Sequence, residues 1–261
     1  MNSRRKFLLQ GGMATTALLA TRPMKTFAKF GAPFSSFDGN SILLIHTSGL
    51  NETTQHSAII SGLKNSVNCI LLDTGNNQTD DHNLHNIAKS LGYDACLTGN
   101  PAFSGSLITD TETGNAQSYR IIKKGSARIG LIAAWVNRNK TTTGNPVHDL
   151  TAIATKLKEE HKCDLVVCLS NHGYNSKQTN DISIAVQSKN IDVIISSQPP
   201  VLNEQLPSIV LNKDKEEVLI NNAGHSNVLL GKIEIGFDMH GKKNRINFSN
   251  VPAGASNKQL I

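Results

Sequence analysis

Five short polar segments follow apolar runs along this chain, and their side chains are mainly amides and hydroxyls. The amides are those of Asn51, Asn76, Asn100, Asn171 and Gln198. The hydroxyls beside them are those of Ser48, Ser170, Ser196 and Ser197. Such groups donate and accept hydrogen bonds without carrying charge. Gathered in one cavity, they suit an uncharged polar ligand such as a sugar or a nucleobase. The chain holds 27 asparagines, so drift in an Asn-rich sequence explains the pattern equally well.

Apolar runs typical of strands buried on both faces precede these segments and continue beyond them. They are Ser41–Thr47, Cys69–Asp73, Ala95–Thr98, Ile129–Val136, Leu165–Ser170, Val193–Ser196, Ile209–Leu211, Val218–Asn221 and Leu229–Phe237. Helical patterns cover Gln55–Asn65, Asp80–Leu91, Leu150–His161 and Asp181–Ser188, with Asp80 or Asp81 as N-cap and Gly92 as C-cap of the second. This order predicts a layered α/β or α+β domain, whose functional groups lie on loops after the strands.

The loops themselves carry a family resemblance. They are His46-Thr47-Ser48-Gly49-Leu50-Asn51, Leu72-Asp73-Thr74-Gly75-Asn76, Leu97-Thr98-Gly99-Asn100-Pro101-Ala102-Phe103, Leu169-Ser170-Asn171-His172-Gly173 and Ile195-Ser196-Ser197-Gln198-Pro199-Pro200. In order and spacing they resemble the calcineurin-like metallophosphoesterases, specifically the N-terminal domain of the 5′-nucleotidase/UDP-sugar hydrolase branch. The resemblance implies an αββα sandwich, with two packed mixed β-sheets flanked by helices, over residues 41–240.

The resemblance also implies where the family's two bridged metal ions would bind, and most of those positions are changed. They hold Gly49, Asn51, Asn76, Asn100, Asn171, Gln198 and Pro200. Only Asn100 is the family's own residue. The family's catalytic His is replaced by Pro101, and the Glu after it by Ala102. Neutral amides do not offset two divalent ions as carboxylates do, and Gly and Pro offer no side-chain ligand. We therefore predict no dinuclear metal site, no catalytic residue and no cofactor.

Histidines near the altered positions are the remaining candidates for a ligand. His172 is one residue from Asn171, but a one-residue shift at a strand end turns a side chain to the opposite face. His46 is expected to be a packed or hydrogen-bonded residue at a strand end. His82 and His85 share a helix face without a third ligand. Asp73 is expected to hydrogen-bond its turn.

The first 28 residues predict export. Arg4 and Arg5, followed by Phe7 and Leu8, resemble a twin-arginine signal, and the stretch 11–20 is too short and too weakly apolar for a stable membrane anchor. Cleavage after Ala20 and cleavage after Ala28 both fit, and a general secretory signal is the alternative route. We expect a periplasmic or otherwise exported protein with an irregular lead-in at 29–40 and a C-terminal tail at 241–261.

The basic charge belongs largely to this signal. It holds five of the 26 basic residues and none of the 20 acidic ones, so the formal charge falls from +6 to +1 after its removal. Charge therefore gives no reason to expect nucleic acid or an anionic membrane as a partner. The four cysteines show no metal-binding spacing. Buried free thiols are expected, with a disulfide left open.

Taken together, the sequence predicts a catalytically inactive binding or scaffold protein. The alternative is a nucleotidase-like phosphoester hydrolase that uses divalent metal at an altered site. The expected partners are a small polar ligand and a separately encoded domain of the nucleotidase C-terminal type, since the branch's second domain is not found in these 261 residues.

Overall fold

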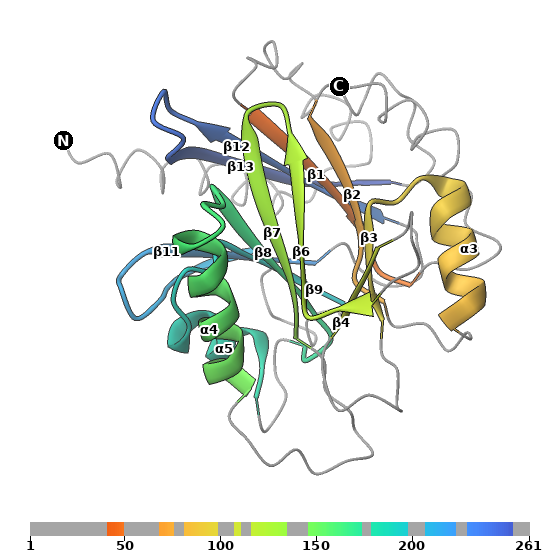
Figure 1. The fold of residues 1–261 in the computed structure, drawn as a ribbon, viewed down its shortest axis with the longest axis horizontal. Coiled ribbons are helices and arrows are strands. Elements are labelled where there is room, and N and C mark those ends of the chain that lie inside the picture. The colour runs from red at the N-terminus through yellow and green to blue at the C-terminus, as the bar shows by residue number, and fades with distance from the viewer. Residues whose placement is uncertain are drawn as a thin grey trace, which may run out of the picture.

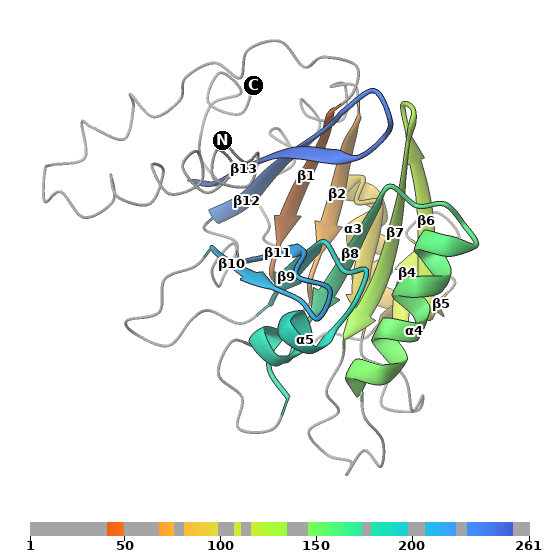
Figure 2. The same ribbon diagram turned by 90° about the vertical axis from the view of Figure 1, so that its left-hand side faces the viewer.

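The computed structural model describes residues 41–49, 68–75, 81–98, 107–110, 116–134, 146–173, 179–197, 207–222 and 229–252. Within them, two β-sheets pack face to face, and helices cover their outer faces (Figures 1 and 2). The predicted sandwich of two mixed sheets flanked by helices is confirmed.

Sheet 1 has seven strands and sheet 2 has six. In spatial order, sheet 1 contains β13 (Lys243–Pro252), β12 (Leu229–Phe237), β1 (Ser41–Thr47), β2 (Cys69–Asp73), β3 (Ala95–Thr98), β4 (Leu107–Asp110) and β5 (Ala116–Gln117). Sheet 2 contains β10 (Ser208–Leu211), β11 (Glu217–Asn221), β9 (Val193–Ser196), β8 (Leu165–Ser170), β7 (Ala127–Ala134) and β6 (Tyr119–Lys124). Strands β1, β2 and β3 run parallel, as do β7, β8, β9 and β11, so their carboxyl ends gather at one end of each sheet.

Alternation along each central strand divides its side chains between two apolar layers. In β8, Val167 and Leu169 face the layer between the sheets, whereas Val166 and Cys168 pack beneath helices α4 (Pro146–Glu159) and α5 (Asp181–Gln187). In sheet 1, the outer layer is covered by α3 (Asp81–Leu91), which contributes Ala88. Both faces of the central strands are buried, as their continuous apolar sequences predicted.

The helix ends follow local sequence signals. Gly92 has a φ of +79°, and the N–H of Tyr93 donates to the carbonyl of Ala88 over 2.9 Å, which confirms Gly92 as the cap of α3. Helix α4 begins at Pro146, four residues before the predicted start. Asn180 caps α5 by accepting from the N–H of Ser183 over 2.7 Å. The helix predicted at Gln55–Asn65 lies outside the described residues.

Four strands have no counterpart in the prediction, namely β4, β5, β6 and β13. The last of these corrects the domain boundary, because residues 241–261 were expected to form a tail. Instead, β13 pairs antiparallel with β12 from Lys243 to Pro252. Ile246 and Phe248 of β13 pack against the layer between the sheets. Its ten residues, KNRINFSNVP, are mostly polar or charged, so their alternation was too weak to predict the strand.

All four cysteines are buried and none forms a disulfide, as expected of free thiols. Burial raises the pKa of the Cys96 and Cys168 thiols, which favours their protonated, unreactive form. Among the described residues, no helix is long and apolar enough to cross a membrane.

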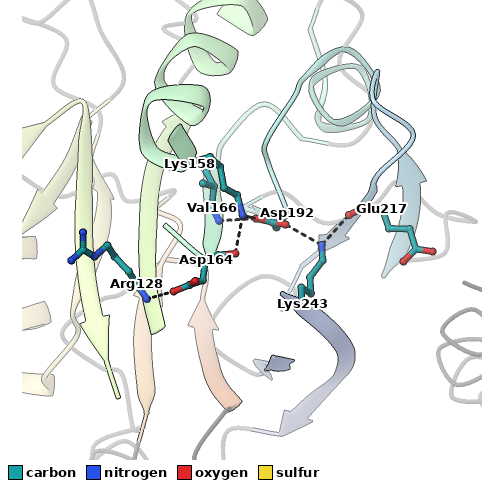
Figure 3. A network of polar contacts seen from close by, with 7 residues as sticks. All are labelled: Arg128, Lys158, Asp164, Val166, Asp192, Glu217 and Lys243. Carbon is teal, nitrogen blue, oxygen red and sulfur yellow. Dashed lines mark hydrogen bonds and ion pairs between the residues drawn. The ribbon is translucent and has the colours of Figure 1, made fainter. Parts of the chain in front are cut away.

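The two sheets are joined at their other end, away from the carboxyl ends of the parallel strands, by Asp192 (Figure 3). Its Oδ2 lies 2.8 Å from Nζ of Lys158 on α4, and its Oδ1 lies 3.1 Å from Nζ of Lys243 on β13. The N–H of Val166 also donates to Oδ2, and Lys243 donates to the carbonyl of Glu217. Burial opposes the charge of Asp192, but the two lysines and the Val166 N–H outweigh it and lower its pKa.

Replacing Asp192 with Asn should lower the unfolding free energy by about 2–4 kcal/mol at neutral pH, because two mostly buried ammonium groups lose their counter-charge. Since the native pKa is lowered, the wild-type contribution is present above about pH 4 and is lost as pH falls through the native pKa. The gap between the two proteins should therefore narrow in acid. Urea unfolding between pH 7 and pH 3 measures it.

The control is Asp214→Asn, which breaks the 2.8 Å pair between Lys189 and Asp214, whose side chains are 47% and 42% exposed. This exposed pair should contribute less than about 1 kcal/mol. Equal losses in the two variants would contradict the role assigned to Asp192.

Candidate functional site

The carboxyl ends of strands from both sheets meet at one place. The N–H of Thr74 after β2 donates to the carbonyl of Thr47 at the end of β1 over 3.0 Å. In sheet 2, the N–H of Ser197 after β9 donates to the carbonyl of Ser170 at the end of β8 over 2.8 Å. The Ser48 hydroxyl crosses between the sheets and donates to the carbonyl of Ser197 over 2.7 Å. Four of the five loops that the sequence singled out, those after β1, β2, β8 and β9, therefore start side by side.

On the sheet 1 side, Asp73 holds the loop after β2. Its Oδ2 accepts from the Thr47 hydroxyl over 2.6 Å, and its Oδ1 accepts from the N–H of Gly75 over 2.8 Å. The Thr47 hydroxyl also lies 3.0 Å from the Tyr93 hydroxyl. Burial and the nearby Asp73 carboxylate raise the pKa of Tyr93, so it stays a neutral phenol. The turn role predicted for Asp73 is confirmed.

On the sheet 2 side, Asp181 fixes the loop that carries Asn171. Asp181 is fully buried, and its Oδ1 accepts from the Ser170 hydroxyl over 2.5 Å. The same hydroxyl accepts from the N–H of His172, and the N–H of Asn171 donates to the carbonyl of Ala134. Burial raises the pKa of Asp181 to about 6, against hydrogen bonds from serine hydroxyls that lower it. The Oδ2 atom of Asp181 has no hydrogen-bond partner among the described residues.

His172 is turned away from the layer between the sheets. Strand alternation places Ser170 and His172 on the helix side of β8, and the bond from Ser170 to Asp181 of α5 agrees with this. His172 Nδ1 lies 3.1 Å from the carbonyl of Thr179, which can only accept, so Nδ1 carries the proton. Burial lowers the pKa of His172, and its neutral Nε2 has no partner within the described part of the chain. The ring is thus held by a backbone carbonyl of its own loop.

His46 lies in the layer between the sheets, as a packed strand-end residue. It is fully buried, and burial lowers its pKa to about 3. Its Nε2 lies 3.1 Å from Nδ2 of Asn221, at the end of β11 in the opposite sheet. Its neighbour across the β1–β12 ladder is Gly231, where a Cβ would come within 2.0 Å of the ring. Only glycine leaves room for this imidazole.

The structure describes two of the residues predicted for the site. Asn171 and His172 lie at the carboxyl end of β8, next to the loops after β9 and β1. Asn51, Asn76, Asn100 and Gln198 lie outside the described residues. Of the seven positions that carry metal ligands in the family, only two are described, those of Gly49 and Asn171.

Neither described position fits a divalent metal ion. Gly49 has no side chain, and its φ of +89° is one that an aspartate could adopt only with strain. Asn171 offers a neutral amide instead of an imidazole. Among the described residues, no group of three His, Cys, Asp or Glu side chains is placed to hold a metal. The described strand ends beside them are held by hydrogen bonds, yet the donors at these two positions do not suit the ions.

Sequence reasoning missed the site roles of Asp181 and Asn221. It also missed the contact between the Ser48 hydroxyl and the carbonyl of Ser197. Asp181 was seen only as the start of a helix, although its partner Ser170 is eleven residues earlier. Asn221 closes an apolar run, as many strand-end asparagines do. Nothing in either local sequence signals the long-range partner.

Comparison with solved structures identifies the architecture. A 5′-nucleotidase precursor from Thermus thermophilus matches 81% of this chain with 16% identity and a TM-score of 0.58. The NAD nucleotidase NadN of Haemophilus influenzae matches 80% with 16% identity and a TM-score of 0.57. The sulfate thiohydrolase SoxB from Thermus thermophilus matches 76% with 16% identity and a TM-score of 0.52. The chain has the calcineurin-like metallophosphoesterase fold.

This metallophosphoesterase fold confirms the resemblance carried by the five loops. The chain spans about half the length of these solved structures, covering 54%, 55% and 42% of them in the same order. No family model and no curated protein matches the sequence. At these identities, the metallophosphoesterase match establishes the fold alone.

Asp181→Asn should stabilise the protein at neutral pH. The native carboxyl holds its proton up to about pH 6, whereas the unfolded one releases it near pH 4, so wild-type stability falls as pH rises between these values. Two pH units correspond to about 3 kcal/mol at most. Asparagine keeps the acceptor for Ser170 and carries no charge, so the variant should lack this fall.

Urea unfolding from pH 4 to pH 8 measures the difference, with Asp149→Asn on the exposed surface of α4 as the control. An Asp181→Asn protein that is less stable than wild type at pH 7 would show that the charged carboxylate stabilises the loop.

Proposed function

We propose that this chain is an exported domain of the 5′-nucleotidase-like metallophosphoesterase type that has lost its dinuclear metal site and acts by binding rather than by hydrolysis. The single observation that carries the proposal is the end of β1, where Gly49 stands at a ligand position with a φ of +89°. Glycine offers no side-chain ligand there, and its backbone has a conformation that residues with a side chain rarely adopt. Restoring a carboxylate by one substitution would meet conformational strain.

Charge supports the same conclusion. Two divalent ions need carboxylates or other strong donors, and a bridging carboxylate to hold them close together. The family's ligand positions here hold five amides, a glycine and a proline, namely Asn51, Asn76, Asn100, Asn171, Gln198, Gly49 and Pro200. The free-energy cost of burying two divalent ions without compensating negative charge would exceed the free energy gained from their contacts with the amides.

The competing function is phosphoester hydrolysis through an altered metal site. It is favoured by the fold itself, which two solved proteins named as nucleotidases share, and by Asn100, the one ligand residue that the sequence retains. The two functions differ in metal content and in turnover, so one purification separates them.

The full chain, expressed with its own leader and purified from the periplasmic fraction, should contain no stoichiometric metal by mass spectrometry. It should not hydrolyse p-nitrophenyl phosphate or nucleoside monophosphates when manganese, zinc or calcium is added. Recovery from the periplasm also tests export, and copurifying proteins test the proposed partner of the nucleotidase C-terminal type. Stoichiometric metal, together with turnover that Asn100→Ala abolishes, would overturn the proposal.

For the ligand, we propose an uncharged polar molecule such as a sugar or a nucleoside. The amide of Asn171, at the carboxyl end of β8, offers donors and acceptors without charge. Such a site would disfavour phosphate, which needs cationic or clustered N–H donors.

Calorimetry with a panel of sugars and nucleosides should show saturable binding that Asn76→Leu and Asn171→Leu each weaken at least tenfold, since each substitution would remove one amide's hydrogen bonds at the cavity. Inorganic phosphate should give no heat of binding. Absence of saturable binding at millimolar concentrations across the panel would end the ligand proposal and leave a scaffold role.

A further inference from the structure

Three neutral contacts cross between the sheets at the carboxyl ends of the strands. Ser48 donates to the carbonyl of Ser197 over 2.7 Å, and Asn221 lies 3.1 Å from the His46 imidazole. Asn250 of β13 donates to the carbonyl of Asn222 after β11 over 3.0 Å. Ser48, His46 and Asn221 are each at most 2% exposed. We call these three contacts the neutral bridge.

The network fixes the proton of His46. The Oδ1 of Asn221 accepts from the N–H of Asn222 over 2.9 Å, so its NH₂ group must face the imidazole. An NH₂ group can only donate, hence Nε2 of His46 accepts and the ring proton is on Nδ1. Burial, which lowers the pKa of His46 to about 3, keeps the ring neutral. The bridge therefore carries no charge at any pH at which the protein would work.

The backbone is shaped around this bridge at two glycines. Gly231 on β12 leaves the space that the His46 ring occupies, since a Cβ there would lie 2.0 Å from Nε2. Gly49 follows Ser48 with a φ of +89°, so the chain turns immediately after the serine that reaches the other sheet. The residue that breaks the family's ligand pattern is thus adjacent to the residue that makes the cross-sheet contact.

The loops after β1 and β2 belong to sheet 1, and those after β8 and β9 belong to sheet 2. Ions bound to ligands from both sets would tie the sheets together at this end. In this chain the Ser48–Ser197 contact already joins the loop after β1 to the loop after β9. The opposite end is joined separately by Asp192 and Lys243.

We propose that the neutral bridge is the structural replacement for the metal ions, so that the carboxyl ends of the two sheets are held together without any divalent cation. The proposal deepens the proposed function and rests on it, because it assumes that the ions are absent. It assigns Ser48, His46 and Asn221 as positioning residues that keep the Asn171 loop and the β1 loop in a fixed relation.

The experiment combines thermal unfolding with NMR. Wild-type melting temperature should be the same in EDTA and in millimolar manganese or zinc, since a cation that does not bind the native state cannot stabilise it. Ser48→Ala and Asn221→Leu should each lower it by about 2–5 °C in every buffer. Ser249→Ala, an exposed serine on β13, is the matched control and should leave it unchanged.

Long-range ¹H–¹⁵N correlation on the wild type tests the bridge without any variant. From pH 5 to pH 8, the expected spectrum shows His46 with a proton on Nδ1 and an unprotonated Nε2. A proton on Nε2 would overturn the bridge, as would melting temperatures of both variants equal to that of Ser249→Ala. A wild-type melting temperature raised by manganese or zinc would overturn both the bridge and the proposed function. The failure of the bridge alone can therefore be told apart from the failure of both.

Discussion

The apolar layer between the two sheets is the constraint on which the rest of the molecule depends. Because β1, β8 and β9 are buried on both faces, their polar neighbours can lie only at the strand ends. The parallel direction of these strands then brings the polar carboxyl ends from both sheets together. At the other end, the Asp192 cluster ties β13 to sheet 2 with paired charges. One end is thus joined by ions and the other by neutral groups.

This contrast bears on function. The largely buried carboxylate of Asp192 is matched by two lysines. At the carboxyl end, the described groups are hydroxyls, amides, neutral imidazoles, the Asp73 carboxylate held by Thr47 and Gly75, and the carboxyl of Asp181, whose pKa burial raises. The uncharged amides and hydroxyls among these groups suit a neutral hydrogen-bonding partner.

The sequence predicted the central strands well because a strand buried on both faces must be continuously apolar, as in Leu165–Ser170. It missed β6, where Arg120, Lys123 and Lys124 interrupt the apolar pattern at a sheet edge, and β13 for a similar reason. The loop sequences also predicted the fold, since each glycine and asparagine follows a strand end at a characteristic spacing. The bridge from Ser48 and the pairing of Ser170 with Asp181 depend on residues far apart in the chain, so no local pattern could predict them.

The central claim is that a metallophosphoesterase fold here exists without the family's metal pair. Anomalous diffraction from crystals soaked in manganese chloride, recorded at the manganese absorption edge, tests it most directly. We predict no anomalous peak among the loops after β1, β2, β8 and β9. Two peaks about 3.5–4 Å apart at that place would contradict the claim.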